Sequence, residues 1–438
     1  MNTTTKENTA PPAENAQAAV SLFLEKTGAR AAAYLDACIR CGACAEACHY
    51  YKASGDPRHA PVNKFRMMEK AYRRHKDPWA WLKRLSGFAP ADPDIGDMQE
   101  WQELIYDTCS MCGRCTLACP MGIDIAHLVA ITRSGLTAAG LAPEPIRSMA
   151  ATARDVGSPM GIDAAQLRDI LNELSEKHDV PIPLDKEKAD VLLIDSSLDY
   201  KVFQPTLVAM ARILENLGID WTFSSKGYEA SNLGLFTGQE DVARAMVERI
   251  VTAAEDVGAS LILAPECGHG YASIRWEAAN ILGRELPFEV LHISEYLARL
   301  HREGRFGLRP LDHPITYHDP CKLGRRGGVI EEPRDILRDL APDYREMEPS
   351  GMENWCCGGG GGVLLLESAA KTRLEAFRIK MDQVERTGAD GVVMACAFCH
   401  HTFDNGAEHF NWDRKVEDLV QLVAEHMILP GDKAASGN

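Results

Sequence analysis

The chain has 438 residues, of which 45% are hydrophobic, so two or three globular domains are expected and a disordered polymer is excluded. Its formal net charge of −16 argues against binding to nucleic acid and against electrostatic attachment to anionic lipid, but it is compatible with docking onto a protein partner. No run of 18 or more apolar residues is present, which predicts that the chain does not span a bilayer.

The N-terminal segment is polar and lacks the basic, apolar and twin-arginine features of an export signal, so residues 1–29 are interpreted as a disordered tail. Fourteen cysteines in such a chain indicate a reducing compartment, where clustered cysteines bind metals more often than they form disulfides. We therefore expect a cytoplasmic protein whose thiols are metal ligands or catalytic groups.

Two identical cysteine runs lie in the segment of residues 30–145, which otherwise has a mostly helical pattern. Both runs have the spacing C-x2-C-x2-C-x3-C, which in ferredoxins lets three thiolates hold one cubane [4Fe–4S] cluster while the fourth holds the neighbouring cluster. The first predicted ligand set is Cys38, Cys41, Cys44 and Cys119, and the second is Cys109, Cys112, Cys115 and Cys48.

A pair of zinc sites is the alternative for these eight cysteines, because zinc is also held by four thiolates. Zinc quartets usually combine two C-x2-4-C knuckles across a longer spacer, whereas both runs here have the ferredoxin spacing. Gly42 and Gly113 stand where the backbone must pass close to a cluster. The long helical spacer between the runs resembles that of the α-helical ferredoxin domain in succinate dehydrogenase and heterodisulfide reductase.

Residues 146–190 are rich in proline and are interpreted as a linker that contains one helix, Ala164–Lys177. Beyond the linker, short apolar strands alternate with amphipathic helices, which predicts βαβ units with a parallel sheet; the first segments are Val191–Asp195, Phe203–Leu217, Asp241–Asp256 and Leu261–Ala264. The pattern occurs twice, over residues 191–308 and 309–428, and residues 429–438 are expected to be loose.

The second repeat carries five cysteines, which are Cys321, Cys356, Cys357, Cys396 and Cys399. In the first repeat the corresponding positions hold Ser197, Asn232, Leu233, Ala264 and Cys267, so only one cysteine remains there. Cys321 and Cys356 are 35 positions apart, as are Ser197 and Asn232. The first repeat is therefore predicted to be a degenerate copy of the second.

The five-cysteine pattern, with Gly358 and Gly359 directly after the adjacent pair, resembles the CCG domain of heterodisulfide reductase catalytic subunits and their relatives. The resemblance covers about Arg30 to His426 and implies an α + α/β protein. An α-helical ferredoxin domain with two cubane [4Fe–4S] clusters would precede a CCG domain of two α/β repeats, the first degenerate. The resemblance also implies a further, non-cubane [4Fe–4S] cluster at the five cysteines, which would form the catalytic site.

Several neighbours of these cysteines are expected to contribute to the site. Glycines would free backbone N–H groups and open the N-terminus of a helix starting near Val363. Lys322 could stabilise a leaving thiolate, hold an acidic substrate tail, or belong to a solvated loop without a role in the site. His400 could supply protons or only hydrogen-bond locally, and Cys267 could be a cluster contact, a substrate-facing thiol or a core residue. Cys396-x2-Cys399-His400 also matches a c-type haem signature, which is set aside because haem attachment follows export.

Within the family, an intact repeat beside a degenerate one resembles membrane-complex subunits such as the DsrK group of sulfur-metabolising bacteria. This resemblance implies a haem b-type, quinone-linked membrane subunit as partner, and attachment to the inner membrane through partner subunits. Electrons would pass through the ferredoxin clusters to the CCG-bound cluster, which would reduce or form a disulfide or trisulfide on a small protein such as DsrC. The alternatives are a relay from a glycolate-, lactate- or glycerol-3-phosphate-type flavoprotein to quinone, and a non-catalytic scaffold.

Overall fold

The computed structural model describes residues 12–431, and the chain divides into two compact units. The first unit contains the chain up to Ser148 and two later segments, Leu235–Gln239 and Gly360–Ala376. The second unit contains Met149–Gly234, Glu240–Gly359 and the chain from Phe377 onward. Two short pieces of the α/β repeats are thus built into the first unit, an exchange that no local sequence pattern indicates.

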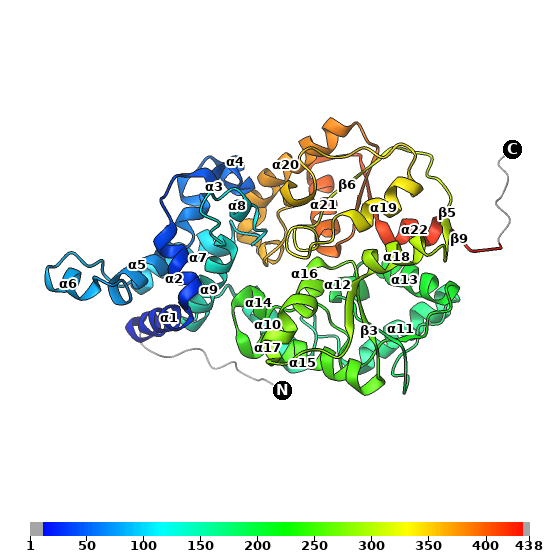
Figure 1. Ribbon diagram of the computed structural model, residues 1–438, viewed down its shortest axis with the longest axis horizontal. Helices are drawn as coiled ribbons and strands as arrows, with labels where there is room; N and C mark the ends of the chain where they lie inside the picture. The colour runs from blue at the N-terminus through cyan, green and yellow to red at the C-terminus, as the bar shows by residue number, and fades with distance from the viewer. Residues whose placement is uncertain (1–11, 432–438) are drawn as a thin grey trace. The chain divides into compact units, whose positions relative to one another are not determined.

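The regular elements described in the first unit are helices (Figure 1). They are α1 (Pro12–Lys26), α2 (Ala29–Ala37), α3 (Ala43–Glu46), α4 (His49–Ser54), α5 (Arg66–His75), α6 (Ala80–Leu85), α7 (Ile95–Tyr106), α8 (Arg114–Leu117) and α9 (Ile125–Ala138). The predicted helical character of this part of the chain is confirmed.

Helix α1 lies in the segment that the sequence predicted to be a disordered tail. Its Phe23 is fully buried against α9, where a Cβ added at Gly135 would lie 1.7 Å from the Phe23 ring. A glycine at position 135 lets the two helices approach closely, so aromatic burial anchors α1 in the core. The prediction of a disordered tail is wrong for α1, and residues 1–11 lie outside the described part of the chain.

Two parallel sheets form the second unit, one from each repeat. The first has the order β2-β1-β3-β4, with β1 (Val191–Leu193), β2 (Trp221–Thr222), β3 (Leu261–Ala264) and β4 (Glu289–His292). The second has the order β6-β7-β8, with β6 (Ile315–Tyr317), β7 (Gly391–Met394) and β8 (Lys415–Asp418). Strands β6, β7 and β8 repeat the order of β1, β3 and β4, as the predicted βαβ duplication requires.

The strands are connected and covered by helices, whose bounds largely follow the predicted amphipathic segments. They are α10 (Glu144–Val156), α11 (Ala164–His178), α12 (Ser197–Lys201), α13 (Gln204–Asn216), α14 (Gly234–Thr237), α15 (Glu240–Val257), α16 (Gly268–Ala272), α17 (Ala278–Leu282), α18 (Ile293–Arg302), α19 (Glu331–Leu340), α20 (Ala370–Thr387), α21 (Ala397–Phe410) and α22 (Leu419–His426). A short antiparallel pair, β5 (Gly307–Leu308) with β9 (Met427–Ile428), joins the end of the first repeat to the end of the second.

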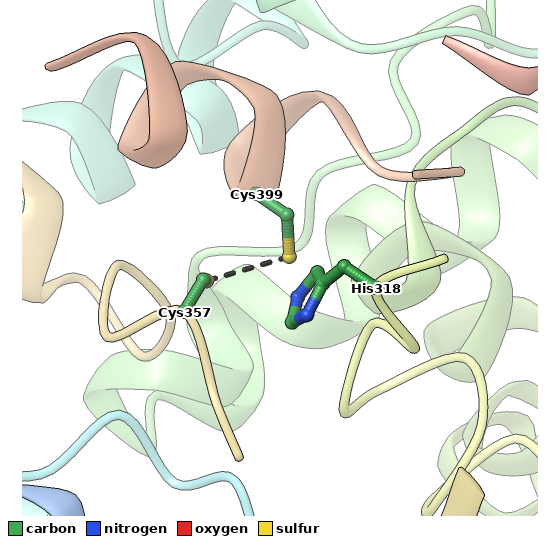
Figure 2. Close-up of side chains that lie close together, drawn as sticks. All are labelled: His318, Cys357 and Cys399. Carbon is green, nitrogen blue, oxygen red and sulfur yellow. Dashed lines mark hydrogen bonds between the residues drawn. The ribbon is translucent and has the colours of Figure 1, made fainter. Parts of the chain in front are cut away.

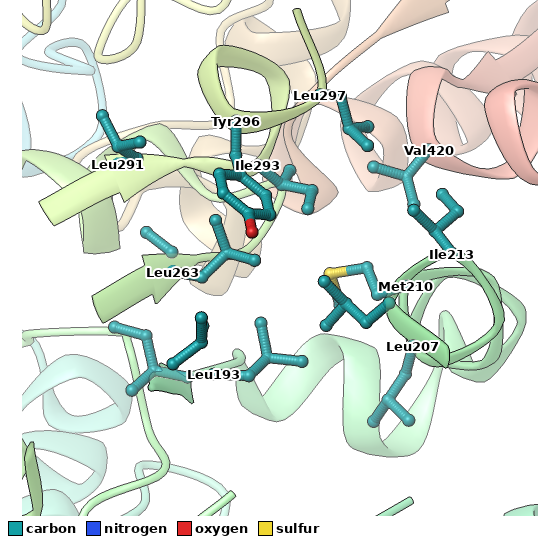
Figure 3. Close-up of a cluster of buried hydrophobic side chains, with 14 of the residues drawn as sticks. Leu193, Leu207, Met210, Ile213, Leu263, Leu291, Ile293, Tyr296, Leu297 and Val420 are labelled. Carbon is teal, nitrogen blue, oxygen red and sulfur yellow. The ribbon is translucent and has the colours of Figure 1, made fainter. Parts of the chain in front are cut away.

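The two repeats share one hydrophobic core (Figure 3). Leu193 and Leu263 from the first sheet, Met210 from α13 and Val420 from α22 of the second repeat all belong to it. Each fully buried side chain of this size stabilises the fold by about 1.5–3 kcal/mol, so the repeats stabilise each other.

Two expectations about connecting segments are wrong. The proline-rich segment predicted as a linker contains the expected helix, as α11, but Leu167 and Leu171 of that helix are buried in the shared core. The helix expected to start near Val363 is a single 3₁₀ turn, Val363–Leu365, and α20 begins only at Ala370. A turn this short has no sizeable dipole, so the proposed helix-dipole stabilisation of an anionic cluster does not apply. Residues 432–438 lie outside the described part.

Candidate iron–sulfur sites

Two cavities in the first unit are each lined by four cysteines. One is lined by Cys38, Cys41, Cys44 and Cys119, and the other by Cys48, Cys109, Cys112 and Cys115. The structure therefore brings together the two crossed sets that the ferredoxin spacing predicts. Thiolates are the ligands that iron–sulfur clusters require, so both sets fit a [4Fe–4S] cluster by donor type and number.

Matching backbone turns create the two cavities. Arg40 and Gly42 have φ of 54° and 83°, and Met111 and Gly113 have φ of 53° and 77°. In each loop, two residues in the left-handed conformation flank one cysteine and turn the backbone around the cavity. The short helices α3 and α8 begin directly after these turns. A glycine meets the second of these turns without steric cost, which explains Gly42 and Gly113.

The second cavity differs from the first because it contains buried polar groups. Lys64 and His49 line it and are 1% and 2% exposed, whereas the first cavity is lined mainly by apolar side chains. Lys64 Nζ donates to the carbonyl and hydroxyl oxygens of Thr108, the residue before Cys109. Desolvation raises the pKa of the Cys48 thiol, and Lys64 acts in the opposite direction. Desolvated thiols ionise when a cation is close, as bound iron would be.

Arg133 of α9 organises the loop of Cys109 from inside the first unit. This guanidinium is fully buried and donates to the carbonyl oxygens of Ile105, Cys109, Phe236 and Gly361, at 3.0, 2.9, 3.2 and 2.5 Å respectively. Phe236 and Gly361 belong to the two segments that come from the repeats. Sequence reasoning missed Arg133, because nothing in its local pattern shows that four distant carbonyls converge on it.

The five cysteines of the second repeat are all buried in the second unit, where three loops bring them together. The sulfurs of Cys357 and Cys399 are 3.4 Å apart, and those of Cys321 and Cys356 are 3.9 Å apart. Figure 2 shows His318 beside the first pair; one of its ring nitrogens and the two sulfurs lie within 4.8 Å of one another. Soft sulfur donors with one imidazole suit iron or another thiophilic metal.

Cys267, the surviving cysteine of the first repeat, lies at this site as well. It is fully buried, and the N–H of the following Gly268 donates to the Cys396 sulfur. A Cβ at Gly268 would lie 2.6 Å from the backbone nitrogen of Leu323, two residues after Cys321. The turn that carries Cys267 is therefore packed between the loops of Cys396 and Cys321, and burial raises the pKa of the Cys267 thiol.

Electrostatics distinguish the individual thiols. The neighbouring thiols of Cys356 and Cys399, with a smaller contribution from His318, lower the pKa of Cys357. Burial lowers the pKa of His318, so its imidazole is neutral at physiological pH. The pKa of Cys357 is thus held well below the usual value of a thiol, a property expected of a metal ligand or nucleophile.

A buried lysine is linked to His318 through the side chain of Asn354. Lys380 of α20 donates to Asn354 Oδ1 at 2.6 Å and to Gln383 Oε1 at 2.5 Å, and Asn354 Nδ2 lies 3.4 Å from His318 Nδ1. Burial lowers the pKa of Lys380 to about 7. Lysine is common on exposed helix faces, so the sequence around Lys380 did not indicate that its side chain is buried.

The remaining predicted site residues are placed differently. Gly358 N–H donates to the Cys356 sulfur at 3.4 Å, and Gly359 faces Thr402, whose hydroxyl would lie 2.0 Å from an added Cβ. His400 Nδ1 lies 2.8 Å from Asp418 Oδ1, and its ring packs against that of Phe203 at a tilt of 33°. Burial opposes its protonation, but hydrogen bonds to Asp404 and Asp418 raise the pKa of His400 to about 10. Lys322 is half-buried in the loop after Cys321.

Comparisons with known protein families agree with this architecture. A 4Fe-4S dicluster domain matches residues 34–123, and a cysteine-rich domain named CCG matches twice, over residues 196–274 and 315–404. The double match supports the duplication inferred from the repeated intervals. Among the described residues, no helix has the length and apolar character needed to cross a membrane.

Curated relatives are similar over most of the chain. One subunit of the dihydromethanophenazine:CoB--CoM heterodisulfide reductase of Methanosarcina barkeri is 32% identical, over 89% of this chain and 93% of the relative. The Hdr-like menaquinol oxidoreductase iron-sulfur subunit of Archaeoglobus profundus is 28% identical, over 90% of this chain and 80% of the relative. EtfAB:quinone oxidoreductase of Syntrophomonas wolfei is 27% identical, over 90% of this chain and 58% of the relative.

The similarity to the Methanosarcina barkeri protein covers 89% of this chain and therefore extends across both units. The chain therefore belongs to the family of iron–sulfur electron-transfer subunits found in heterodisulfide reductase and in heterodisulfide reductase-like oxidoreductases.

Proposed function

We propose that this protein passes electrons through two cubane [4Fe–4S] clusters to a third, non-cubane [4Fe–4S] cluster at Cys321, Cys356, Cys357, Cys396 and Cys399, where a disulfide or trisulfide is reduced or formed. The observation that carries this proposal is the convergence of five buried cysteines with His318. A relay alone needs four thiolates for a cluster, whereas this site offers five, and Cys267 lies beside them.

The chemistry requires two electrons and two protons for each disulfide that becomes two thiols. A bound cluster supplies electrons one at a time together with iron that can hold a thiolate. The chain's own groups handle protons and orientation. Neutral His318 lies against Cys357 and Cys399, and Lys380 reaches His318 through Asn354. These groups can hold a proton for the product thiolate at a buried site.

We propose a haem b-type, quinone-linked membrane subunit as the electron partner and a small disulfide-carrying protein, such as DsrC, as the substrate. The names of the relatives support the first part, since they include a menaquinol oxidoreductase subunit and a dihydromethanophenazine-linked reductase subunit. Attachment to the inner membrane through that partner follows from the same proposal.

The decisive variant is Cys357→Ala, made in anaerobically purified protein. We expect reduction of the CoB–CoM heterodisulfide or of an oxidised DsrC-type protein to be abolished, while the EPR signals of both ferredoxin clusters persist. Cys267→Ala serves as the matched buried thiol in the same site and is expected to keep the third cluster. Retained turnover in Cys357→Ala would exclude this site.

The second candidate function is an electron relay between a flavoprotein and quinone, without disulfide chemistry. The similarity to EtfAB:quinone oxidoreductase favours it. The two functions separate in one assay, because a relay oxidises reduced electron-transfer flavoprotein when quinone is present and does not act on either disulfide.

A further inference from the structure

One end of the first unit exposes a dense group of large apolar side chains. Helix α6 and its flanking residues carry Trp79, Trp81, Leu82, Leu85 and Phe88, which are 62, 60, 43, 81 and 84% exposed. In Figure 1, α6 lies at the end of the first unit, beyond α5. Large apolar side chains scattered singly are normal on a protein surface, but five within ten residues mark an interaction site.

Polar contacts, and not burial of these rings, hold the α6 tip (residues 76–88) in shape. Asp77 accepts hydrogen bonds from the Trp79 N–H and from Lys83 Nζ, both at 2.8 Å. The Phe88 N–H donates to the Lys83 carbonyl oxygen at 2.8 Å and closes the far end. The aromatic and leucine side chains are therefore free to contact a partner without unfolding the helix.

The charge of this region has the opposite sign to that of the whole chain. From Arg73 to Phe88 there are five Lys or Arg residues and one Asp, in a protein with a formal net charge of −16. Arg73 pairs with Asp36, Glu69 and Asp77, Arg74 pairs with Asp92, and Lys83 pairs with Asp77. By contrast, no carboxylate lies within 4 Å of the exposed Arg84 among the described residues. An anionic surface would attract this end of the molecule through the cations that no carboxylate neutralises, such as Arg84.

We propose that the α6 tip inserts its apolar side chains into the headgroup region of a bilayer that contains anionic lipid. Tryptophan together with lysine and arginine is the composition of interfacial segments, because the rings occupy the boundary layer while the cations stay at the phosphates. On α6 the apolar Trp81, Leu82 and Leu85 are spaced to share one side, and Lys83 and Arg84 occupy the other. Direct lipid contact would add to any attachment through partner subunits and does not depend on the proposed redox chemistry.

Vesicle binding of the intact, anaerobically purified protein tests this proposal. We expect at least roughly tenfold tighter binding to vesicles of phosphatidylcholine with phosphatidylglycerol than to phosphatidylcholine alone, with a strong decrease at high salt. The variant W81Q/L85Q/F88Q should lose at least roughly tenfold in vesicle affinity. Arg84→Gln should lose about fivefold on anionic vesicles only.

Trp276→Gln is the matched control, because Trp276 is 49% exposed but lies in the second unit. Its vesicle binding should equal that of the wild type. All variants should keep the wild-type iron content and thermal midpoint, since the replaced side chains are exposed. The proposal is overturned if pure anionic vesicles do not bind the protein, if the triple variant binds them normally, or if binding requires a membrane protein, which would assign the α6 tip to a protein partner.

Discussion

The two CCG repeats share the same order of corresponding strands but differ in the residues at their cysteine positions. Where the second repeat has Cys321, the first has Ser197, whose hydroxyl bonds to Glu229 and lies 2.9 Å from that of Ser158. Where the second repeat has Cys356, the first has Asn232, which donates to the Ala243 carbonyl at 3.0 Å. Hydrogen bonds thus replace the sulfur ligands, which teaches that this α/β unit folds around either a ligand set or a polar network.

The same contrast appears in the aspartates that precede these positions. In the register that aligns Cys321 with Ser197, Asp319 aligns with Asp195 and Arg334 with Met210. Asp319 forms a buried ion pair with Arg334, at 2.7 Å, whereas one carboxylate oxygen of Asp195 has no partner among the described residues. Burial and the neighbouring Asp199 carboxyl raise the pKa of Asp195, whereas its counterpart is held by a guanidinium.

Exchanging the aligned cysteine and serine should give the largest effect. Cys321→Ser is expected to reduce disulfide turnover below about 1% of wild type, because one thiolate of the proposed ligand set is lost. The reciprocal Ser197→Cys should add no iron, since Asn232 and Leu233 cannot complete a ligand set. Iron and sulfide counting on both variants checks this, and extra iron in Ser197→Cys would contradict the view that the first repeat has lost its site.

Replacing each of the two aligned aspartates by asparagine should change the free energy of unfolding by different amounts. Asp319→Asn removes one of the two carboxylates that hold the buried Arg334, leaving only the half-exposed Glu346, and should lower the free energy of unfolding by about 3 kcal/mol. Asp195→Asn removes a carboxyl group that has no buried cation beside it and whose pKa is already raised, so it should change the free energy of unfolding by less than about 1 kcal/mol. Thermal or urea unfolding of both variants measures the difference; equal losses would show that the two carboxyl groups play the same role.

The buried acids of the first repeat should make stability fall as pH rises. Burial raises the pKa of Glu229 to about 7, above its usual value of 4.5, so the folded state binds more protons between these pH values. The free energy of unfolding therefore decreases from about pH 4.5 to pH 7 and stays low above that. Glu229→Gln should recover about 1–3 kcal/mol at about pH 8 and little below about pH 4.5.

Thermal midpoints measured across this pH range test the sign of the effect. Glu176→Gln is the control, because Glu176 is exposed on α11. A pH profile that Glu229→Gln leaves unchanged would show that this acid is ionised in the folded protein.

A smaller effect is expected at Gly268, where the first repeat packs against the Cys321 loop of the second repeat. Gly268→Ala would push a Cβ against Leu323 and should cost about 1–3 kcal/mol, with a shifted EPR spectrum of the third cluster. Gly307→Ala, at a glycine whose added Cβ would have no atom within 4 Å, should leave both stability and spectrum unchanged. If Gly268→Ala is as silent as Gly307→Ala, the first repeat does not shape the site of the second.

Much of this architecture follows from short-range sequence signals. The spacing of Cys38, Cys41 and Cys44 requires a loop around one centre, and the apolar runs at β1 and β3 require buried strands. Such signals are local, because the residues that create them are close in the chain. The alignment of Cys321 with Ser197 was equally accessible, since duplication preserves intervals.

Long-range contacts could not be predicted in this way. The exchange of Gly360–Ala376 into the first unit, the four carbonyls around Arg133 and the inward position of Lys380 depend on residues far apart in the chain. The anchoring of α1 was missed for a related reason. This alanine-rich segment is part of the core because Phe23 packs against Gly135 of α9, which is far away in the chain. Local composition indicates whether a helix can form, and tertiary packing decides whether it does.

The glycine run after the cysteine pair has a consequence for electron transport. Gly361 packs against the backbone of Cys109 and Ser110, and its carbonyl oxygen accepts a hydrogen bond from Arg133. Because Cys357 precedes Gly361 by only four residues, their Cα atoms are at most about 14 Å apart. A continuous peptide path of four residues therefore joins Cys357 to the loop of the ferredoxin quartet that contains Cys109. Under the function proposed above, this quartet is the expected electron donor to the third cluster.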